Sequence, residues 1–202
     1  MLDNKLSDLL RHSVAESGFT EALTFSLCSR DDVSTKLRQP LKNEEVVHIG
    51  NPKTLDFQIA RTTLLPGLLK TVQANRKMPL PLKLFEISDV VLRTGTTDVG
   101  AKNERRMCAL NYNKTPGFET VHGLLDRVMQ LLEVPPAPTK ESLDGYRLSG
   151  IEDPTFQPGR CAEIIACGKV IGKLGVLHPE TVTKFELTCP CAAMELNIEP
   201  FL

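Results

Sequence analysis

Residues 82–93 read LKLFEISDVVLR, and every second side chain of this run returns to the same side of an extended strand. One side carries Leu84 and Glu86, and the other side carries Phe85 and Ile87. The run therefore predicts a largely apolar strand with a carboxylate, Glu86, at its centre. Glu86 is either a catalytic or ligand-binding group or an acid that its neighbours satisfy, and the strand alone leaves both alternatives open.

The segment before this strand predicts a helix. Residues 60–76 read ARTTLLPGLLKTVQANR, and their apolar side chains recur at helical spacing. Thr62 or Thr63 can cap this helix, and Pro66 is tolerated in its first turn, where no intrahelical amide bond is lost. The segment KMPLP at residues 77–81 ends the helix and leads into the strand.

The first part of the chain predicts a second amphipathic helix and a further strand. Apolar residues recur at helical spacing up to Val14, and Gly18 follows where a left-handed residue ends a helix. The run FTEALTFSL at residues 19–27 is rich in Phe, Thr and Leu, which favours a strand. Residues 29–45 are polar and are expected to loop out, whereas residues 46–49 predict a short strand.

The remaining elements determine the fold class. Residues 106–112 predict a strand, and residues 118–132 carry a strong apolar helical stripe. Residues 162–178 contain two apolar runs around Gly168 and Lys169, a two-residue loop typical of a tight hairpin. This order of elements indicates an α+β fold built on a mostly antiparallel sheet with helices on one side.

Composition and charge exclude several classes of protein. The chain has 202 residues, with 24 Lys and Arg against 25 Asp and Glu, and 5% aromatic residues with no Trp. That balance gives no field toward phosphate backbones and few platforms for bases, so the chain alone is not expected to bind nucleic acid. The six cysteines form no CxxC pair, and neither a signal peptide nor a run of about 18 apolar residues is present. We therefore expect one cytoplasmic domain over residues 1–202, outside any membrane.

The common catalytic signatures are missing from the sequence. It has no GxxxxGKS/T, GxGxxG, GxSxG or HExxH pattern. Cys189, Cys191 and His178 lack the second pair of ligands that a structural zinc site needs, so no metal site is predicted. His178 directly precedes Pro179, which favours an extended residue whose imidazole bonds to the backbone.

Four stretches of the sequence, taken in combination, match one known family. They read RTTLLPGLLKTVQANR (61–76), PLKLFEISDVV (81–91), GRCAEIIACGKVIGKLGVLHPETVTKFEL (159–187) and AAMELNIEPFL (192–202). Together they resemble the carboxyl-terminal catalytic-like domain of the phenylalanyl-tRNA synthetase beta subunit, of the eukaryotic cytosolic or archaeal type. The resemblance spans nearly the whole chain, which we expect to be a C-terminal fragment of a longer beta subunit.

The resemblance implies a class II aminoacyl-tRNA synthetase-like antiparallel sheet flanked by helices. In such ligases two alpha and two beta subunits assemble in the cytoplasm for protein biosynthesis. The alpha subunit activates phenylalanine with ATP and magnesium and charges tRNA(Phe), while this beta domain is a degenerate copy of the catalytic core. The implied partners are the alpha subunit and, through the assembly, tRNA(Phe). No cofactor is expected in this chain, whereas ATP and magnesium are expected in the complete enzyme.

Residue 86 provides a test of that degeneracy. A working class II core needs an arginine on its second-motif strand, in a pattern like FRxE, to neutralise phosphate charge. Here Phe85 is followed by Glu86, and the expected third motif, GxGxGxxR, is replaced by ELNIEPFL at residues 195–202. We therefore expect no catalytic residue and no metal ligand in this chain. Glu86 is interpreted as a structural carboxylate that requires a charged or hydrogen-bonding partner.

Class II cores commonly dimerise through the helix and strand of their first motif, which residues 2–14 and 19–27 resemble. The resemblance implies that the helix contacts the alpha subunit through Leu6, Leu9, Leu10 and Val14. The alternative is that this stripe packs only on its own sheet, because amphipathic helices ordinarily face their own core. For the function, the alternative is a free-standing regulatory or binding module derived from a synthetase.

Overall fold

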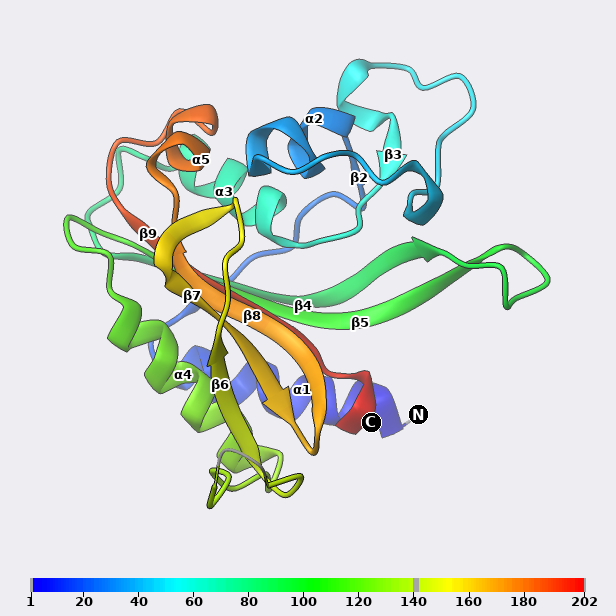
Figure 1. Ribbon diagram of the computed structural model, residues 1–202. Helices are drawn as coiled ribbons and strands as arrows, with labels where there is room; N and C mark the ends of the chain where they lie inside the picture. Colours follow the sequence, from blue (N-terminus) through cyan, green and yellow to red (C-terminus); the bar gives the residue numbers. More distant parts are fainter. Residues whose placement is uncertain (1, 140–141, 202) are drawn as a thin grey trace.

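A seven-stranded sheet organises the chain, whose computed structural model describes residues 2–139 and 142–201 (Figure 1). All neighbouring strands are antiparallel except β1 and β4, which confirms the predicted mostly antiparallel sheet. From edge to edge the strands are β1 (Thr20–Glu21), β4 (Leu82–Arg93), β5 (Ala101–Tyr112), β9 (Cys191–Asn197), β8 (Lys169–Leu177), β7 (Phe156–Ala166) and β6 (Tyr146–Gly150). A second, small sheet pairs β2 (Leu27–Cys28) with β3 (Ile59–Ala60).

Helices cover both faces of the sheet, and not one face as the sequence predicted (Figure 1). One face packs against α1 (Leu2–Glu16) and α4 (Phe118–Leu131), and the other lies below α2 (Arg30–Val33), α3 (Leu65–Ala74) and α5 (Pro179–Lys184). Short 3₁₀ turns occupy Thr35–Leu37, Asn43–Glu45, Leu55–Phe57 and Glu199–Phe201. None of the helices in the described part of the chain is long and apolar enough to cross a membrane.

Two hydrophobic cores result from this arrangement, one on each side of the sheet. The alternation of β4 sends Phe85 and Ile87 into the core beneath α1 and α4. It sends Leu84 and Val90 into the core beneath α3. A strand with apolar residues on both faces therefore requires helices on both faces, which explains why the prediction of one covered side was wrong.

The strand predicted over residues 19–27 is interrupted, since the main ladder includes only Thr20–Glu21. The reason is that the amide of Thr24 donates to the side chain of Glu86 (3.3 Å) and not to a neighbouring strand. Residues 46–49 likewise form a single bridge, at His48 opposite Ile59, and not a strand.

Two predicted turn details have different outcomes. The helix α3 begins after Leu64, and the Thr63 hydroxyl oxygen accepts a bond from the Leu65 amide at 3.4 Å, as the predicted cap requires, while the hydroxyl also donates to Glu195. The β7–β8 turn consists of Cys167 and Gly168, one position earlier than predicted. Both turn residues have positive φ, as a type I′ hairpin turn requires.

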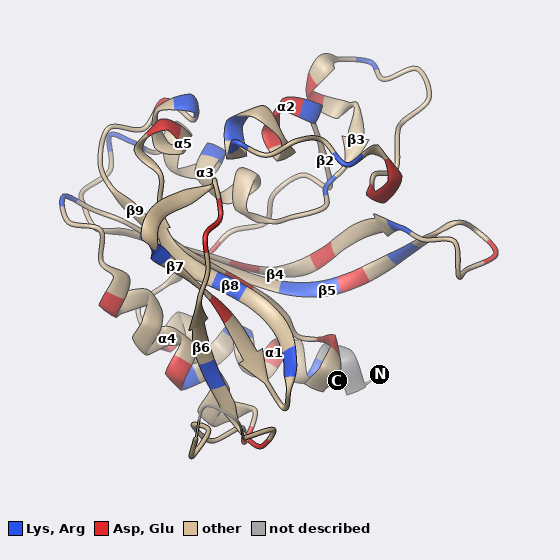
Figure 2. Ribbon diagram, viewed as in Figure 1, with Lys and Arg blue, Asp and Glu red and all other residues tan. Residues whose placement is uncertain are grey.

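Charges of both signs are interspersed along the elements (Figure 2), in agreement with the balanced composition. The long β4–β5 hairpin extends beyond the rest of the sheet (Figure 1) and carries several of these charges. The two signs lie close together along the backbone, which gives no extended field toward the phosphates of a nucleic acid.

Candidate functional site

A row of polar side chains crosses the sheet on the face below α3. Glu86 on β4 lies opposite Cys108 on β5, which lies opposite Glu195 on β9. Glu195 in turn lies opposite Lys173 on β8, and Lys173 lies opposite Glu163 on β7. Residues paired across neighbouring strands share one face, so Glu86 belongs to a row over five strands in which Cys108 is the uncharged member.

Glu86 is held by a buried arginine. Its side chain is 1% exposed and lies 2.8 Å from Nη1 of Arg61, whose side chain is 5% exposed. Thr24 donates to the same carboxylate from its hydroxyl (2.7 Å) and its amide (3.3 Å). Arg61 Nη1 also donates to the Thr24 hydroxyl (3.0 Å), and Arg61 Nε donates to the carbonyl of Asp89 (3.0 Å). The Glu86 carboxylate therefore directs its hydrogen bonds inward and is sealed from any ligand.

The sequence predicts that Glu86 needs a charged or hydrogen-bonding partner, but it does not identify that residue. Arg61 is 25 residues away and directly follows β3, with Ala60 before it and Leu64 three residues after it. Gly67 on α3 completes the enclosure, because a Cβ there would lie 2.3 Å from the Thr24 hydroxyl oxygen. A side chain at residue 67 would therefore push Thr24 away from Glu86.

A cavity of about 440 Å³ lies beside this cluster, above β5, β8 and β9. On its floor Arg106 contacts Glu195 (2.9 Å) and Glu104 (2.8 Å). Burial alone would lower the pKa of the Arg106 guanidinium, but these two carboxylates raise it overall. Glu195 also accepts bonds from the Thr63 hydroxyl and the Leu64 amide, so its position is fixed from several sides.

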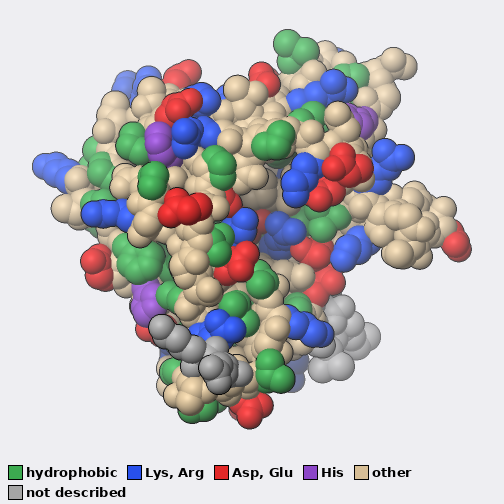
Figure 3. All heavy atoms as spheres, in the orientation of Figure 1, with side chains coloured by type: hydrophobic (Ala, Val, Ile, Leu, Met, Phe, Trp, Pro, Cys, Tyr) green, Lys and Arg blue, Asp and Glu red, His purple; other side chains and the backbone are tan. Residues whose placement is uncertain are grey.

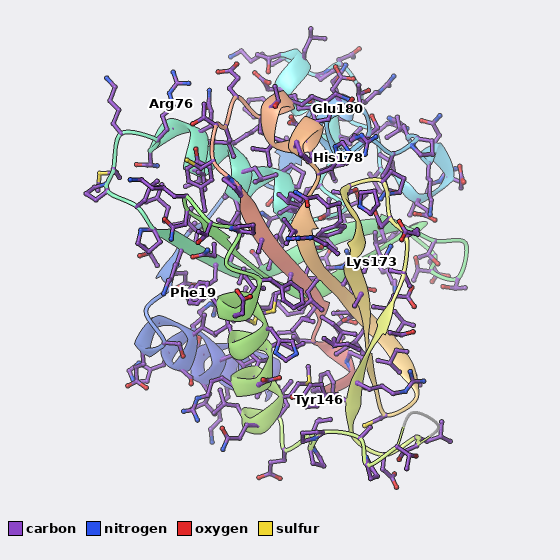
Figure 4. The ribbon with its side chains drawn as sticks, turned by 60° about the vertical axis from the view of Figure 1, so that its left-hand side comes forward. Phe19, Arg76, Tyr146, Lys173, His178 and Glu180 are labelled. Carbon is purple, nitrogen blue, oxygen red and sulfur yellow. The ribbon has the colours of Figure 1, made fainter. Side chains whose placement is uncertain are left out.

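A second ion pair occupies the other side of the cavity. Lys173 contacts Asp153 at 2.9 Å, and the same carboxylate accepts bonds from the Gln39 side chain and the Thr155 amide, both at 2.9 Å. Burial raises the pKa of Asp153, but the hydrogen bonds from Lys173 and Thr155 lower it overall. Figure 4 shows Lys173 between His178 and Glu180 at one end of the molecule and Tyr146 at the other.

The charges of the cavity do not fit a triphosphate with its metal. Its lining includes the cations Lys42, Arg106 and Lys173 against the carboxylates Glu45, Glu104, Asp153 and Glu195. Each of these cations contacts a carboxylate, so none is left to neutralise phosphate oxygens. Basic and acidic side chains lie together around the hollow in the middle of this face (Figure 3). Within residues 2–139 and 142–201, no group of three metal-ligating side chains is placed to hold an ion.

The remaining candidates from the sequence have local roles. His178 is extended and accepts a hydrogen bond from the amide of Glu180 at 3.1 Å, as predicted. Cys189 and Cys191 are free thiols, and burial raises the pKa of Cys191 well above its ordinary value. Within the described residues, these three side chains do not form a group that could hold a metal ion.

The four helix residues predicted to face the alpha subunit do not share one surface. Leu10 and Val14 are fully buried in the chain's own core, and Leu6 packs against that core. Leu9 is 61% exposed, with the exposed Lys5 and His12 one turn away on either side. This corrects the prediction for Leu10 and Val14, because their helical stripe already covers the sheet. A contact of Leu9 with a partner stays a prediction.

Comparison with known proteins identifies relatives along nearly the whole chain. Residues 2–198 match the family model described as "Phenylalanyl tRNA synthetase beta chain CLM domain". The human and Drosophila melanogaster phenylalanine–tRNA ligase beta subunits are 63% and 64% identical over 199 residues, which is 98% of this chain and 33% and 34% of theirs. The Arabidopsis thaliana "beta subunit, cytoplasmic" is 44% identical over 98% of this chain and 34% of its own. The chain thus spans about a third of the length of these curated relatives.

A solved structure supports the fold. The Desulfitobacterium hafniense pyrrolysyl-tRNA synthetase PylSc superposes with a TM-score of 0.74 over 98% of this chain and 66% of that chain. The two sequences are 13% identical, so this likeness concerns the fold alone. It confirms the class II synthetase-like architecture that the resemblance implied.

Proposed function

This chain belongs to the phenylalanyl-tRNA synthetase beta-chain family, and we propose that it is a non-catalytic structural module of phenylalanine–tRNA ligase. In this proposal it supports the alpha subunit, which activates phenylalanine with ATP and charges tRNA(Phe). The observation that carries the proposal is the reversed charge at residue 86. A class II core is expected to present an arginine to phosphate at this point, whereas Glu86 is an acid neutralised by Arg61.

The electrostatics of the sheet face support this proposal. Transition-state stabilisation of adenylate formation requires positive charge directed at the reacting phosphate. Arg106 is the arginine that lines the neighbouring cavity, and two carboxylates already surround it. A bound triphosphate would therefore meet four carboxylates without a free cation, so the residues of this chain do not fit ATP or its magnesium.

The bonds of residues 37–39, which lie over this face of the sheet, give further support. The carbonyl of Leu37 accepts a bond from the Thr155 hydroxyl at 2.7 Å, and Gln39 bonds to Asp153. Arg38 donates to the carbonyl of Pro154 at 2.6 Å and contacts Glu180 at 3.0 Å. These bonds hold the segment across the face on which a synthetase would receive its substrates.

The wider assembly belongs to the same proposal. We place the chain in a cytoplasmic ligase of two alpha and two beta subunits, with no membrane contact and with tRNA(Phe) bound through the assembly. In this proposal, the alpha subunit binds ATP and magnesium. The word "beta" in the relatives' names supports a partner subunit, and the Arabidopsis relative's name supports the cytoplasm.

The proposal is tested by titrating the purified chain with ATP and magnesium in a calorimeter, followed by pyrophosphate exchange with phenylalanine. We expect no saturable heat and no exchange, because the phosphate-binding cations are missing. The alpha subunit combined with this chain is the positive control. Saturable ATP binding with exchange by the chain alone would overturn the non-catalytic assignment.

A second function has one observation in its favour. The cavity of about 440 Å³ lies in the size range of small-molecule sites, and its walls include the apolar residues Leu37, Leu65 and Phe156. A free-standing regulatory module could hold a small ligand there, such as an amino acid. Titration with phenylalanine separates the two functions, because saturable binding without ATP binding favours the regulatory module.

A further inference from the structure

Residues 27–60 form a unit with a small sheet and a hydrophobic core of its own. The strands β2 and β3 pair the two ends of this unit, with Leu27 opposite Ala60. Its core is separate from the two cores of the main sheet and consists of residues within the unit, namely Cys28, Val46 and Ile59 with Val33 and Leu41 packed against them. The unit lies above β4 and β5 (Figure 1). We call residues 27–60 the cap, which has the internal contacts to keep its shape when it moves.

The two ends of the cap are fastened to the main sheet at one point. The chain enters the cap after Ser26 and leaves it at Arg61, whose amide donates to the Ser26 carbonyl at 2.9 Å. The Arg61 carbonyl in turn accepts a bond from the amide of Val91 on β4 at 2.9 Å. The Arg61 guanidinium donates to Glu86 at 2.8 Å and to the Thr24 hydroxyl at 3.0 Å. Entry, exit and β4 are thus clamped together, and a unit clamped at one point has its hinge there.

Beyond this clamp, the cap is held to the rest of the chain through residues 32–39, which we call the latch. Most of the latch contacts are polar. The bonded pairs are Asp32–Lys70, Thr35–Lys184, Arg38–Glu180 and Gln39–Asp153. Among the described residues, Leu37 is the apolar side chain by which the cap enters the core beneath α3. Hydrogen bonds and ion pairs that exchange with water contribute little net free energy, so the latch holds the cap only weakly.

Two hollows separate the cap from the sheet and its helices, one on each side of the latch. Val33 and Leu37 line the cavity of about 440 Å³ above β5, β8 and β9. Asp32 and Lys36 line a second depression of about 600 Å³, which borders α3. A contact packed like a protein interior leaves few such voids. Sparse apolar contact is typical of the parts of a fold that open most easily.

We propose that the cap is a hinged lid, which turns as one unit about the clamp at Glu86 when the latch releases. In the closed position the latch lies over the cavity whose floor carries Arg106 and Glu195, and opening exposes that floor. The clamp gives Glu86 a mechanical role, because it keeps both ends of the moving unit on β4. A lid goes beyond the proposed function, since a structural module needs no moving part.

The test measures the distance between the cap and the sheet in the full chain by electron paramagnetic resonance. Spin labels are attached to p-acetylphenylalanine introduced at two exposed sites, Lys53 in the cap and Lys169 on β8. The latch variant is Leu37→Ala with Gln39→Ala. We expect this variant to raise the population of a longer distance at least about tenfold over the wild type. A second label pair, at Glu44 and Lys53, lies within the cap and should give the same distance in both proteins.

The matched control is Lys42→Ala, because Lys42 bonds to Glu45 within the cap and not to the sheet. It should give the wild-type distances. Lys70→Gln is a milder second variant that removes one ion pair of the latch, so it should shift the distance in the same direction even if the double variant melts early in circular dichroism.

The other results argue against a lid. Wild-type distances in both latch variants would show that the cap is a fixed part of the fold. A broadened distance within the cap would show that residues 27–60 unfold and do not turn as a unit. An equal opening in Lys42→Ala would place the latch elsewhere. Neither ATP nor the alpha subunit enters these measurements, so the lid and the proposed function can fail separately.

Discussion

Removing the partner of Glu86 should test whether this carboxylate is a structural group. Arg61→Met keeps most of the side-chain volume but leaves Glu86 charged at 1% exposure, with Thr24 as its remaining donor. Breaking a buried ion pair on one side costs about 3–5 kcal/mol. For a chain of this size each kcal/mol lowers Tm by about 2–4 °C, so the loss should be roughly 6–20 °C.

The free energy of unfolding of Arg61→Met is measured by urea denaturation. The control is Arg93→Met, which removes an exposed arginine from the end of β4, the strand that carries Glu86. That control should change stability by less than about 0.5 kcal/mol. The double variant Arg61→Met with Glu86→Met removes both charges, and it should be more stable than the sum of the two single losses by about 1–3 kcal/mol. An Arg61→Met protein as stable as the Arg93→Met control would refute the argument.

Two other outcomes follow from the same structure. Acid should weaken the contact between Gln39 and Asp153. Folding lowers the pKa of Asp153, so the stability that this carboxylate contributes is complete above its ordinary pKa of 3.8. That stability is lost as the pH falls through the lower pKa of the folded state. Asp153→Asn should remove this part of the acid dependence in urea denaturation between pH 2 and about 5, and an unchanged acid profile would contradict it. Leu10→Ala should cost about 2–5 kcal/mol because it opens a cavity in the core, whereas Leu9→Ala should cost less than about 0.5 kcal/mol; equal losses would show that α1 is not packed as described.

Periodicity in the sequence predicted the elements that local side chains determine. The strand at residues 82–93 and the helix at residues 118–132 were found at nearly the expected positions, because alternation and helical spacing are local patterns. The strand over residues 19–27 was wrong at its centre. Its composition favours a strand, but Glu86 captures the Thr24 amide from more than sixty residues away, and no local pattern contains that contact.

The candidate site shows the same limit. The sequence correctly required a partner for Glu86 if it were buried, because an unpaired carboxylate in a core is too costly. Arg61 becomes that partner only when the chain after β3 is brought beside β4, where the Val91 amide donates to the Arg61 carbonyl, a tertiary arrangement that spacing along the chain does not contain. The prediction for Leu10 and Val14 of α1 is corrected for a related reason: an apolar stripe does not reveal whether its own core or another subunit covers it, and these two side chains lie in the chain's own core.

The charge at residue 86 determines how the loop at Thr24 is held. An arginine at this position would lie against Arg61 in a buried site, and two adjacent guanidinium groups without an acid repel each other strongly. It would also leave the hydroxyl and amide of Thr24 without the acceptor that now anchors them. The loop would then lose the bonds that direct Leu23 and Phe25 outward. In this chain, an arginine at residue 86 and the observed anchoring of the loop at Thr24 therefore exclude each other.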